Sequence, residues 1–266
     1  MQASSRSEFV QPAAPARRRV TIGSVAIDVL TFAEAIDAIE ALVVRRQGGM
    51  VFTPNVDHIC VADEDPRFRE AYQKADLSLV DGTPVMWAAR LMGSPLPEKI
   101  SGSDLIRPLA ERAAQRGWRI YLLGGQPGVA IEARTILERD YPGLQIVGTS
   151  APMIDLSRDV SEQKDIVDEI RAAKPDLLFL ALGAPKQEIW AQRIRDTVGP
   201  VVMLGIGASL DFVTGAAKRS PPWMSVVGLE WIYRLAQEPE RLWKRYLLRD
   251  PKFLAILLRD ARTRRR

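Results

Sequence analysis

The residues of this sequence that could do chemistry stand directly after short apolar runs. The run LSLV is followed by Asp81 and Gly82, and the run MVF is followed by Thr53, Pro54 and Asn55. A partly desolvated carboxylate can take a proton from a hydroxyl group, and threonine and asparagine can hydrogen-bond a sugar. Both motifs also have a structural interpretation, with Asp81 as the N-cap of a following helix and Asn55 in an Asx-type turn.

A glycine-rich turn, GGQPG at residues 124–128, is a second chemical feature. Backbone N–H groups in such a turn, placed before a helix, can hold a phosphate group. The turn lacks the full GxGxxG spacing, and the next strand ends without the acidic residue that binds the ribose in nicotinamide enzymes. These departures count against a nicotinamide oxidoreductase, while the turn remains compatible with a nucleoside diphosphate.

The signals for a metal site are weak. The DED triplet at residues 63–65 matches the DxD pattern that binds metal-nucleotide complexes in many glycosyltransferases, but a solvated helix end before Pro66 is the favoured interpretation. One cysteine and one histidine exclude both a Cys/His zinc spacing and an internal disulfide. We expect His58 and Cys60 to be packing residues, and we expect neither a metal ion nor a cofactor.

The hydrophobic pattern predicts a set of elements that would bring these motifs together. One or two short strands with a turn at Gly23-Ser24 are predicted within residues 20–31. Further strands are predicted from residue 48 up to Pro54 and at residues 77–80, 118–124, 144–149, 176–183 and 200–207. Helices are predicted at residues 31–46, 57–75 with a break near Pro66, after Gly82, and at 103–116, 128–140, 160–173 and 185–197. This alternation is typical of βαβ units in an α/β protein with a mainly parallel sheet. Ligands bind outside the carboxyl ends of such strands, so the loops there are the expected walls of one site.

Composition and charge separate the ends of the chain from its middle. The 266 residues are 47% hydrophobic and 26% charged, which suits a globular protein with a sizeable core. Residues 1–19 lack a secretory signal and are typical of a disordered arm. No stretch reaches the ~20 apolar residues that span a bilayer. We therefore expect a body at residues 20–215 and an appendage at residues 216–266.

The appendage carries the basic character of the chain. Residues 241–266 hold ten Lys or Arg and two Asp, so the net charge of +4 arises there and the rest of the chain is acidic. Apolar and basic residues alternate at helical intervals with tryptophans among them, which is typical of an amphipathic element on a membrane surface. A C-terminal helix docked on the body is the alternative. The acidic body counts against nucleic acid as a partner.

Seven segments, taken in order, resemble the WecG/TagA/CpsF family of bacterial glycosyltransferases. They are TPNVDH, ADLSLVDGTPVMWAARLMG, KISGSDLI, YLLGGQPG, LLFLALGAPKQEIW, GIGASLDFVTGAAKRSPPWM and GLEWIYRLAQEPERLWKRYL, and the resemblance covers about residues 20–247. It implies a Rossmann-like α/β body with a helical C-terminal appendage that contributes to the site and to membrane attachment. The expected location is peripheral, on the cytoplasmic face of the inner membrane.

The resemblance also implies a reaction. A sugar would move from a UDP-sugar to a polyprenyl-diphosphate-linked saccharide, with inversion and without a metal ion, in cell-surface polysaccharide synthesis. N-acetylmannosamine, N-acetylmannosaminuronate and glucose are the candidate sugars. The expected partners are the donor, the lipid-linked acceptor and the membrane surface, and a homo-oligomer is compatible with the sequence. A non-catalytic nucleotide-sugar-binding protein on the membrane remains the alternative function.

Residue by residue, the resemblance implies Asp81 as the general base, with Thr53 and Asn55 beside it in the catalytic site. It implies substrate contacts by Gln187 and, in the appendage, by Arg234, Arg241 and either Lys244 or Arg245. The arginines would neutralise the charge that grows on the diphosphate. The same motifs predict further substrate contacts at Gly82, Gly102, Asp104, Gly124 and Gly125.

Overall fold

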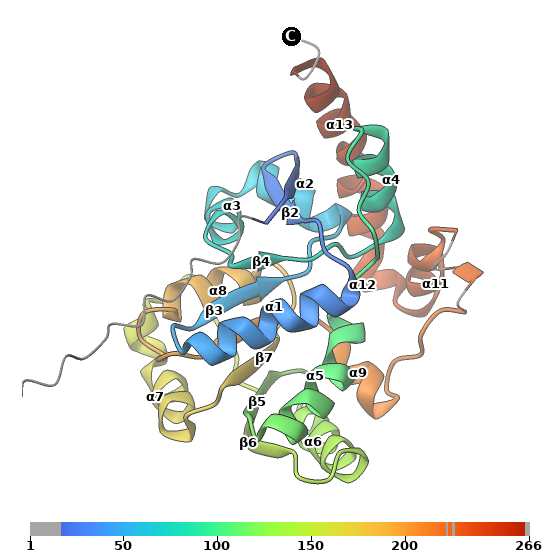
Figure 1. The fold of residues 1–266 in the computed structure, drawn as a ribbon. Coiled ribbons are helices and arrows are strands. Elements are labelled where there is room, and N and C mark those ends of the chain that lie inside the picture. The colour runs from blue at the N-terminus through green and yellow to red at the C-terminus, as the bar shows by residue number, and fades with distance from the viewer. Residues whose placement is uncertain (1–16, 222, 225–226, 264–266) are drawn as a thin grey trace, which may run out of the picture.

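A six-stranded sheet lies at the centre of the computed structural model, which describes residues 17–221, 223–224 and 227–263. The strand order is β4-β3-β8-β7-β5-β6, and every neighbouring pair is parallel (Figure 1). The strands are β3 (Gly49–Phe52), β4 (Leu77–Ser78), β5 (Arg119–Gly124), β6 (Gln145–Ser150), β7 (Leu177–Ala181) and β8 (Val202–Gly205). All six carboxyl ends therefore meet at one edge.

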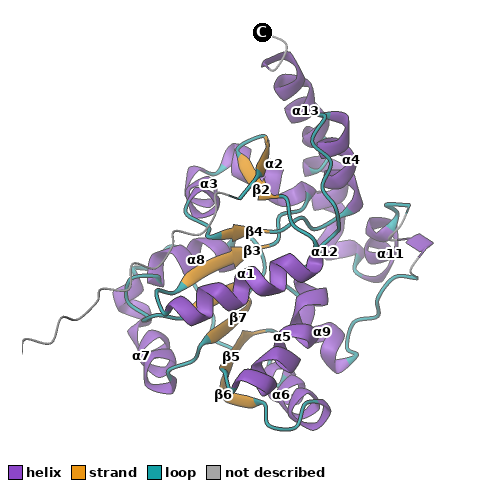
Figure 2. Cartoon of the chain, in the orientation of Figure 1, coloured by secondary structure: helices purple, strands orange, loops and turns teal. Residues whose placement is uncertain are grey.

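Helices cover both faces of this sheet (Figure 2). One face carries α1 (Phe32–Arg45), α5 (Gly102–Arg116), α6 (Val129–Asp140) and α9 (Ser209–Thr214). The other carries α2 (Val56–Glu64), α3 (Pro66–Gln73), α7 (Lys164–Ala173) after a 3₁₀ turn η1 (Val160–Gln163), and α8 (Lys186–Ile194). The α/β class with a Rossmann-like parallel sheet, predicted from the sequence, is confirmed.

The apolar runs of the strands explain this layering. Leu178 and Leu180 of β7 belong to the core on one face, whereas Leu177 and Phe179 belong to the core on the other face. Successive side chains of a strand point to opposite faces, so a strand covered on both sides needs an almost continuous apolar run.

Local signals set several element boundaries as predicted. The side chain of Thr31 caps α1, and the Glu34 side chain accepts a hydrogen bond from the Thr31 backbone N–H, which completes a capping box. The predicted helix at 57–75 is divided before Pro66, because Asp65 ends α2 and caps α3. The strand predicted at residues 77–80 is shorter in the structure, since β4 pairs only over Leu77–Ser78 and the chain leaves the sheet before residue 80.

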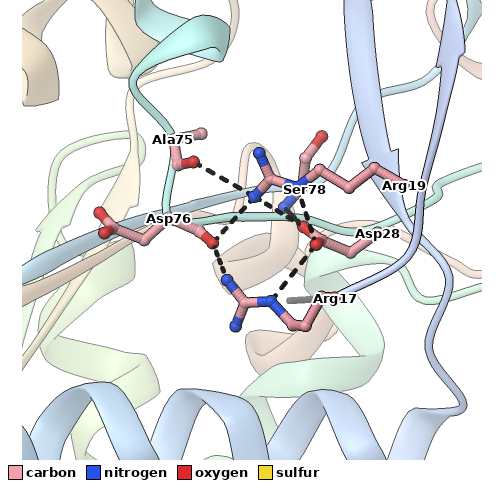
Figure 3. A network of polar contacts seen from close by, with 6 residues as sticks. All are labelled: Arg17, Arg19, Asp28, Ala75, Asp76 and Ser78. Carbon is pink, nitrogen blue, oxygen red and sulfur yellow. Dashed lines mark hydrogen bonds and ion pairs between the residues drawn. The ribbon is translucent and has the colours of Figure 1, made fainter. Parts of the chain in front are cut away.

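A small antiparallel hairpin, β1 (Arg19–Ile22) and β2 (Val25–Asp28), is fastened to the sheet by a buried carboxylate. Asp28 is 2% exposed, and it accepts hydrogen bonds from the Arg19 side chain at 2.9 Å and from the Ser78 backbone N–H at 2.8 Å (Figure 3). Arg17 adds an ion pair to Asp28. Residues 17–19 are therefore part of the body, which corrects the boundary of the predicted arm; its other residues lie outside the described residues.

The C-terminal part forms a series of helices at the end of the sheet (Figure 1). They are α11 (Glu230–Gln237), α12 (Pro239–Lys244), a π-helical turn η2 (Arg245–Arg249) and α13 (Lys252–Thr263). A further helix, α4 (Thr83–Leu91), follows β4 much earlier in the chain. No helix among the described residues is both long enough and apolar enough to span a bilayer.

The last helix, α13, is docked on the body, as one of the two interpretations of the tail predicted. Phe253 and Ile256 are buried in the core that α2 and the hairpin share. Arg259 pairs with Asp63 at 2.7 Å, Lys252 pairs with Glu64, and Asp65 caps α3. The DED triplet therefore makes structural contacts, and its first two residues hold α13.

The hairpin generates a stability prediction. Replacing Asp28 by alanine should lower the free energy of unfolding by about 2–3 kcal/mol, because the buried Ser78 N–H loses its acceptor and two arginines lose their anion. Urea unfolding followed by circular dichroism measures the change. Asp37→Ala, at an exposed position of α1, should stay within about 0.5 kcal/mol of the wild type. Equal stability of the two variants would contradict the assignment.

Candidate active site

A cavity of about 390 Å³ lies between the carboxyl edge of the sheet and the C-terminal helices. The body contributes Asn55, from the loop after β3, and residues 81–84, from the loop after β4. The C-terminal part contributes Glu230, Trp231, Arg234, Arg245, Tyr246 and Asp250. Residues that are about 150 or more positions apart in the chain therefore share one site.

The backbone around Asp81 turns its side chain toward this cavity. The Asp81 N–H donates to the Pro54 carbonyl at 2.9 Å, which ties the loops after β3 and β4 together. Helix α4 starts from Gly82, which is its N-cap without a side-chain hydrogen bond and has a φ of 103° that favours glycine. The N-cap interpretation of Asp81 is therefore wrong, and its carboxylate lines the cavity instead.

The electrostatics of the cavity tune the Asp81 carboxyl group. Burial raises the pKa of Asp81 from 3.8 to about 6, while Arg234 and Lys99 lower it and Glu230 and Asp104 raise it. A carboxyl group with a pKa near neutrality is a stronger base than an ordinary aspartate and is still ionised at pH 7. The group is thus suited to accept a proton from a bound hydroxyl.

Asn55 has a structural role at the start of α2 and also reaches the cavity. Its side chain caps α2 by accepting a hydrogen bond from the His58 N–H at 3.2 Å, and the residue also lines the cavity. Thr53 is 7% exposed and is not among the residues that line the cavity. The predicted sugar contacts of both residues stay predictions.

Arg234 is the basic residue that faces Asp81 from α11. Its guanidinium pairs with Glu230 at 2.9 Å and lies over the Phe212 ring at 5.4 Å. Glu230 also pairs with Lys99 at 3.6 Å. These contacts hold Arg234 at the cavity wall, where the sequence predicted a substrate-binding arginine.

Lys244 and Arg245, the two alternatives for one substrate contact, lie in different environments. Arg245 lines the cavity, and its Nε lies 3.3 Å from Oδ2 of Asp57. Lys244 is exposed beside the Trp243 ring and is not among the lining residues. Arg241 belongs to α12, but its side chain lies outside the described residues. Of the pair, Arg245 is the one that lines the same cavity as Asp81.

Other predicted substrate residues lie along the same edge of the sheet but outside this cavity. Gln187 is buried, donates to Glu188 at 2.8 Å and accepts from the Gly207 N–H at 3.0 Å, which links α8 to the loop after β8. Asp104 pairs with Arg219 at 2.7 Å in a second cavity of about 320 Å³. Their proposed substrate contacts stay predictions.

Three predicted glycines meet packing or backbone requirements of the fold. A Cβ on Gly124 would lie 2.5 Å from the Ala181 carbonyl oxygen, and one on Gly102 would lie 2.9 Å from the Ile206 Cα. Gly125 has a φ of 80°, in the region that favours glycine. These requirements explain the glycines without a ligand, so a phosphate contact by the glycine-rich turn stays a prediction.

His58 and Cys60 are packing residues, as predicted. His58 is buried beside the Phe68 ring, and its Nδ1 lies 2.7 Å from the Tyr72 hydroxyl. Burial lowers the pKa of His58 to about 4, and burial raises the pKa of Cys60 to about 12. Neither group is charged near neutral pH.

Sequence reasoning missed several lining residues, among them Glu230, Trp231, Tyr246 and Asp250. Glu230 and Arg234 are four positions apart, a spacing that places them together on one helix face and could have indicated the pair. Asp250 gave no such signal. Burial raises the pKa of Asp250 to about 6, so this cavity holds another carboxyl group, besides Asp81, whose pKa lies closer to neutral pH than usual.

Comparison with known proteins gives a consistent assignment. The model of the "Glycosyl transferase WecG/TagA/CpsF family" matches residues 20–266. An N-acetylglucosaminyldiphosphoundecaprenol N-acetyl-beta-D-mannosaminyltransferase of Bacillus spizizenii is 34% identical over 218 residues, 82% of each chain. Proteins of the same name are 30% identical in Bacillus subtilis, over 83% of each chain, and 29% identical in Staphylococcus aureus, over 85% of this chain and 86% of that one.

The raised pKa of Asp81 generates a prediction about stability and pH. The folded protein holds this proton up to about pH 6, whereas the unfolded chain releases it near pH 3.8, so ionisation costs stability as pH rises through this window. Asp81→Asn should therefore be about 1–2 kcal/mol more stable than the wild type at pH 7.5 and equally stable at pH 3.5. Urea unfolding at the two pH values measures this, and a gain that does not depend on pH would contradict it.

Proposed function

The chain belongs to the WecG/TagA/CpsF family of glycosyl transferases, and from this premise we propose that it moves a sugar from a UDP-sugar to a polyprenyl-diphosphate-linked saccharide. The observation that carries the proposal is one desolvated carboxylate, Asp81, sharing a cavity with Arg234 and Arg245. The names of the relatives favour N-acetylmannosamine as the sugar and an N-acetylglucosaminyl-diphosphoundecaprenol acceptor. N-acetylmannosaminuronate and glucose are the other candidates for the transferred sugar.

Asp81 acts as the general base in this proposal. Its carboxylate takes the proton of the acceptor hydroxyl, and the hydroxyl oxygen forms a bond to the anomeric carbon of the donor. The bond between that carbon and the diphosphate oxygen breaks, and UDP leaves from the opposite face. Attack opposite the leaving group inverts the anomeric configuration. Gly82, which has no side chain, lets the donor approach the backbone beside the base.

The arginines act on the leaving group. Negative charge grows on the diphosphate as its bond to the sugar breaks, and guanidinium groups bind phosphate oxygens through two parallel N–H donors. Arg234 and Arg245 supply the compensating positive charge from the cavity wall, and Arg241 joins them in the proposal. They do what a divalent cation does in other sugar transferases, so the proposed reaction needs no metal ion. The structural contacts of residues 63–65 support this, because they occupy the DxD pattern.

A membrane surface is the proposed location of the reaction. Among the described residues, most exposed large apolar side chains lie on α4 or between residues 223 and 258. The exceptions are Val44, Ile131 and Met153. Trp87 and Leu91 of α4 are joined to this group through Gly228, where an added Cβ would meet the Trp87 ring at 2.8 Å. Such a concentration of apolar side chains is typical of a surface that contacts a partner or a lipid.

The surroundings of this apolar surface favour lipid as its partner. Lys244 and Arg262 are exposed near the apolar side chains of the C-terminal helices, and each basic group near an anionic bilayer contributes about 1 kcal/mol. The cavity with Asp81 is lined by Trp231 and Leu254 of the same surface. We therefore propose peripheral attachment to the cytoplasmic face of the inner membrane, where a lipid-linked acceptor is within reach of the cavity.

The catalytic role of Asp81 is testable by transfer of labelled sugar from UDP-sugars to a polyprenyl-diphosphate-GlcNAc acceptor in detergent, with and without EDTA. Asp81→Asn should lower kcat at least about a hundredfold, because general-base catalysis contributes roughly 10²–10⁴ in rate. The wild-type rate should fall as pH drops below about 6, where Asp81 becomes protonated. Asp168→Asn on the exposed face of α7 is the matched control and should keep full activity.

An Asp81→Asn variant with wild-type kcat would remove the base from the mechanism. Binding of UDP by the wild type without turnover of any UDP-sugar would instead favour the non-catalytic binding protein. Full inhibition by EDTA would contradict transfer without a metal ion.

The lipid-facing surface is tested by replacing Leu254 and Leu258 with glutamate in one variant. Both side chains are more than 60% exposed, so the fold should tolerate the change. Each leucine buried in lipid contributes about 1.5–3 kcal/mol, so binding to phosphatidylglycerol vesicles should weaken more than tenfold in a sedimentation assay. Glutamates at Val44 and Ile131 are the matched control and should leave binding unchanged. Equal binding of the two double variants would overturn this surface.

A further inference from the structure

We propose that Asp57 is a positioning residue for the site, which holds Arg245 in place and so directs its guanidinium into the cavity. The proposal rests on the proposed function, in which Arg245 acts on the diphosphate. It concerns a residue that does not itself line the cavity and that lies on the body, two positions after Asn55.

The geometry of Asp57 suits this role. The residue is 5% exposed in the first turn of α2, and it contacts two arginines of the π-helical turn at once. Its Oδ1 accepts a hydrogen bond from Arg249 at 2.9 Å, and its Oδ2 lies 3.3 Å from the Nε of Arg245. The two arginines are four positions apart, so both side chains reach the same carboxylate. The positive end of the α2 dipole also favours a carboxylate at this place.

The π-helical turn determines which side chains of this segment face the body. The Asp250 N–H donates to the Arg245 carbonyl at 2.9 Å, which closes a turn one residue wider than an α-helical turn. A wider turn changes which side chains face the body. Lys244, one position earlier, is exposed, whereas Arg245 and Tyr246 line the cavity. An ion pair to the body at Arg245 fixes this choice.

Helix α13 is attached to the body by contacts that do not involve Asp57. Phe253 and Ile256 are buried against the body, and Arg259 pairs with Asp63 on the same helix, α2. The Gly23 N–H also donates to the Asp260 side chain at 2.6 Å. A buried carboxylate costs desolvation energy, and these other contacts already provide attachment. Placement of Arg245 is therefore the function that Asp57 adds.

A set of five variants tests the proposal: Asp57→Asn, Asp57→Glu, Arg245→Gln, the double variant Asp57→Asn/Arg245→Gln, and Asp63→Asn. Asparagine at 57 keeps one acceptor oxygen and turns an NH₂ group toward one arginine. We expect kcat for sugar transfer to fall about 10- to 100-fold in Asp57→Asn with little change in KM, because the misplaced arginine acts in the transition state. Asp57→Glu should recover part of the loss.

The double variant separates positioning from a merely structural role. If Asp57 acts through Arg245, the double variant should be no slower than Arg245→Gln alone. Asp63→Asn is the matched control, because it removes a carboxylate–arginine pair between α2 and the C-terminal helices away from the cavity. It should keep the wild-type kcat. Losses that multiply in the double variant, or an equal loss in Asp63→Asn, would overturn the proposal.

Hydrogen exchange tests the contact independently of sugar transfer. The amides of residues 245–250 should exchange faster in Asp57→Asn than in the wild type and at the wild-type rate in Asp63→Asn. Unchanged exchange in Asp57→Asn would overturn the proposal even in an active enzyme. Absence of sugar transfer by the wild type would instead contradict the proposed function. The exchange data would still decide whether Asp57 holds the turn.

Discussion

The candidate site depends on keeping one carboxylate largely away from water beside positive charge that comes from the other end of the chain. Burial raises the pKa of Asp81, and Arg234 opposes that rise. With more water the group would be an ordinary weak base, and with less positive charge it would stay protonated at neutral pH. Arg234 and Glu230 of α11 act on this pKa in opposite directions, so the balance depends on where the C-terminal helices lie.

The docking of the C-terminal helices on the body is therefore important for the site. The contacts between α13 and α2 are of two kinds, a small apolar core at Phe253 and Ile256 and ion pairs at residues 63 and 64. The exposed ion pairs contribute little each, so the buried side chains carry most of the attachment. Helix α2 also meets the π-helical turn η2 at Asp57, close to the cavity, where placement of a charge matters more than attachment.

Much of the fold was predictable because its signals are local. The capping box of Thr31 and Glu34, the break before Pro66 and the apolar runs of the strands need only neighbouring residues to be interpreted. The site was predictable in part, since the carboxyl ends of parallel strands must meet at one edge. The N-cap role considered for Asp81 was wrong because spacing cannot tell whether the helix starts from the aspartate or from Gly82.

The tail shows most clearly what the sequence leaves undecided. A helix that alternates apolar and basic residues fits a membrane surface and a docked position equally well, and α13 has one buried and one exposed apolar face. Phe253 and Ile256 are buried in the body, while Leu254 and Leu258 are exposed. The choice between Lys244 and Arg245 was similarly undecided, because the family resemblance fits either residue with a shift of one position. The structure has a π-helical turn starting at Arg245.

The two faces of α13 also connect the proposed location of the protein to its proposed chemistry. Leu254 lies at the rim of the cavity, and Leu258 lies one turn further along the exposed face. A bilayer that takes up these side chains would lie at the same end of the molecule as Arg245 and Tyr246, which line the cavity with Leu254. In the proposed reaction the acceptor arrives from that bilayer, so the surface proposed to bind lipid adjoins the cavity that Asp81 lines.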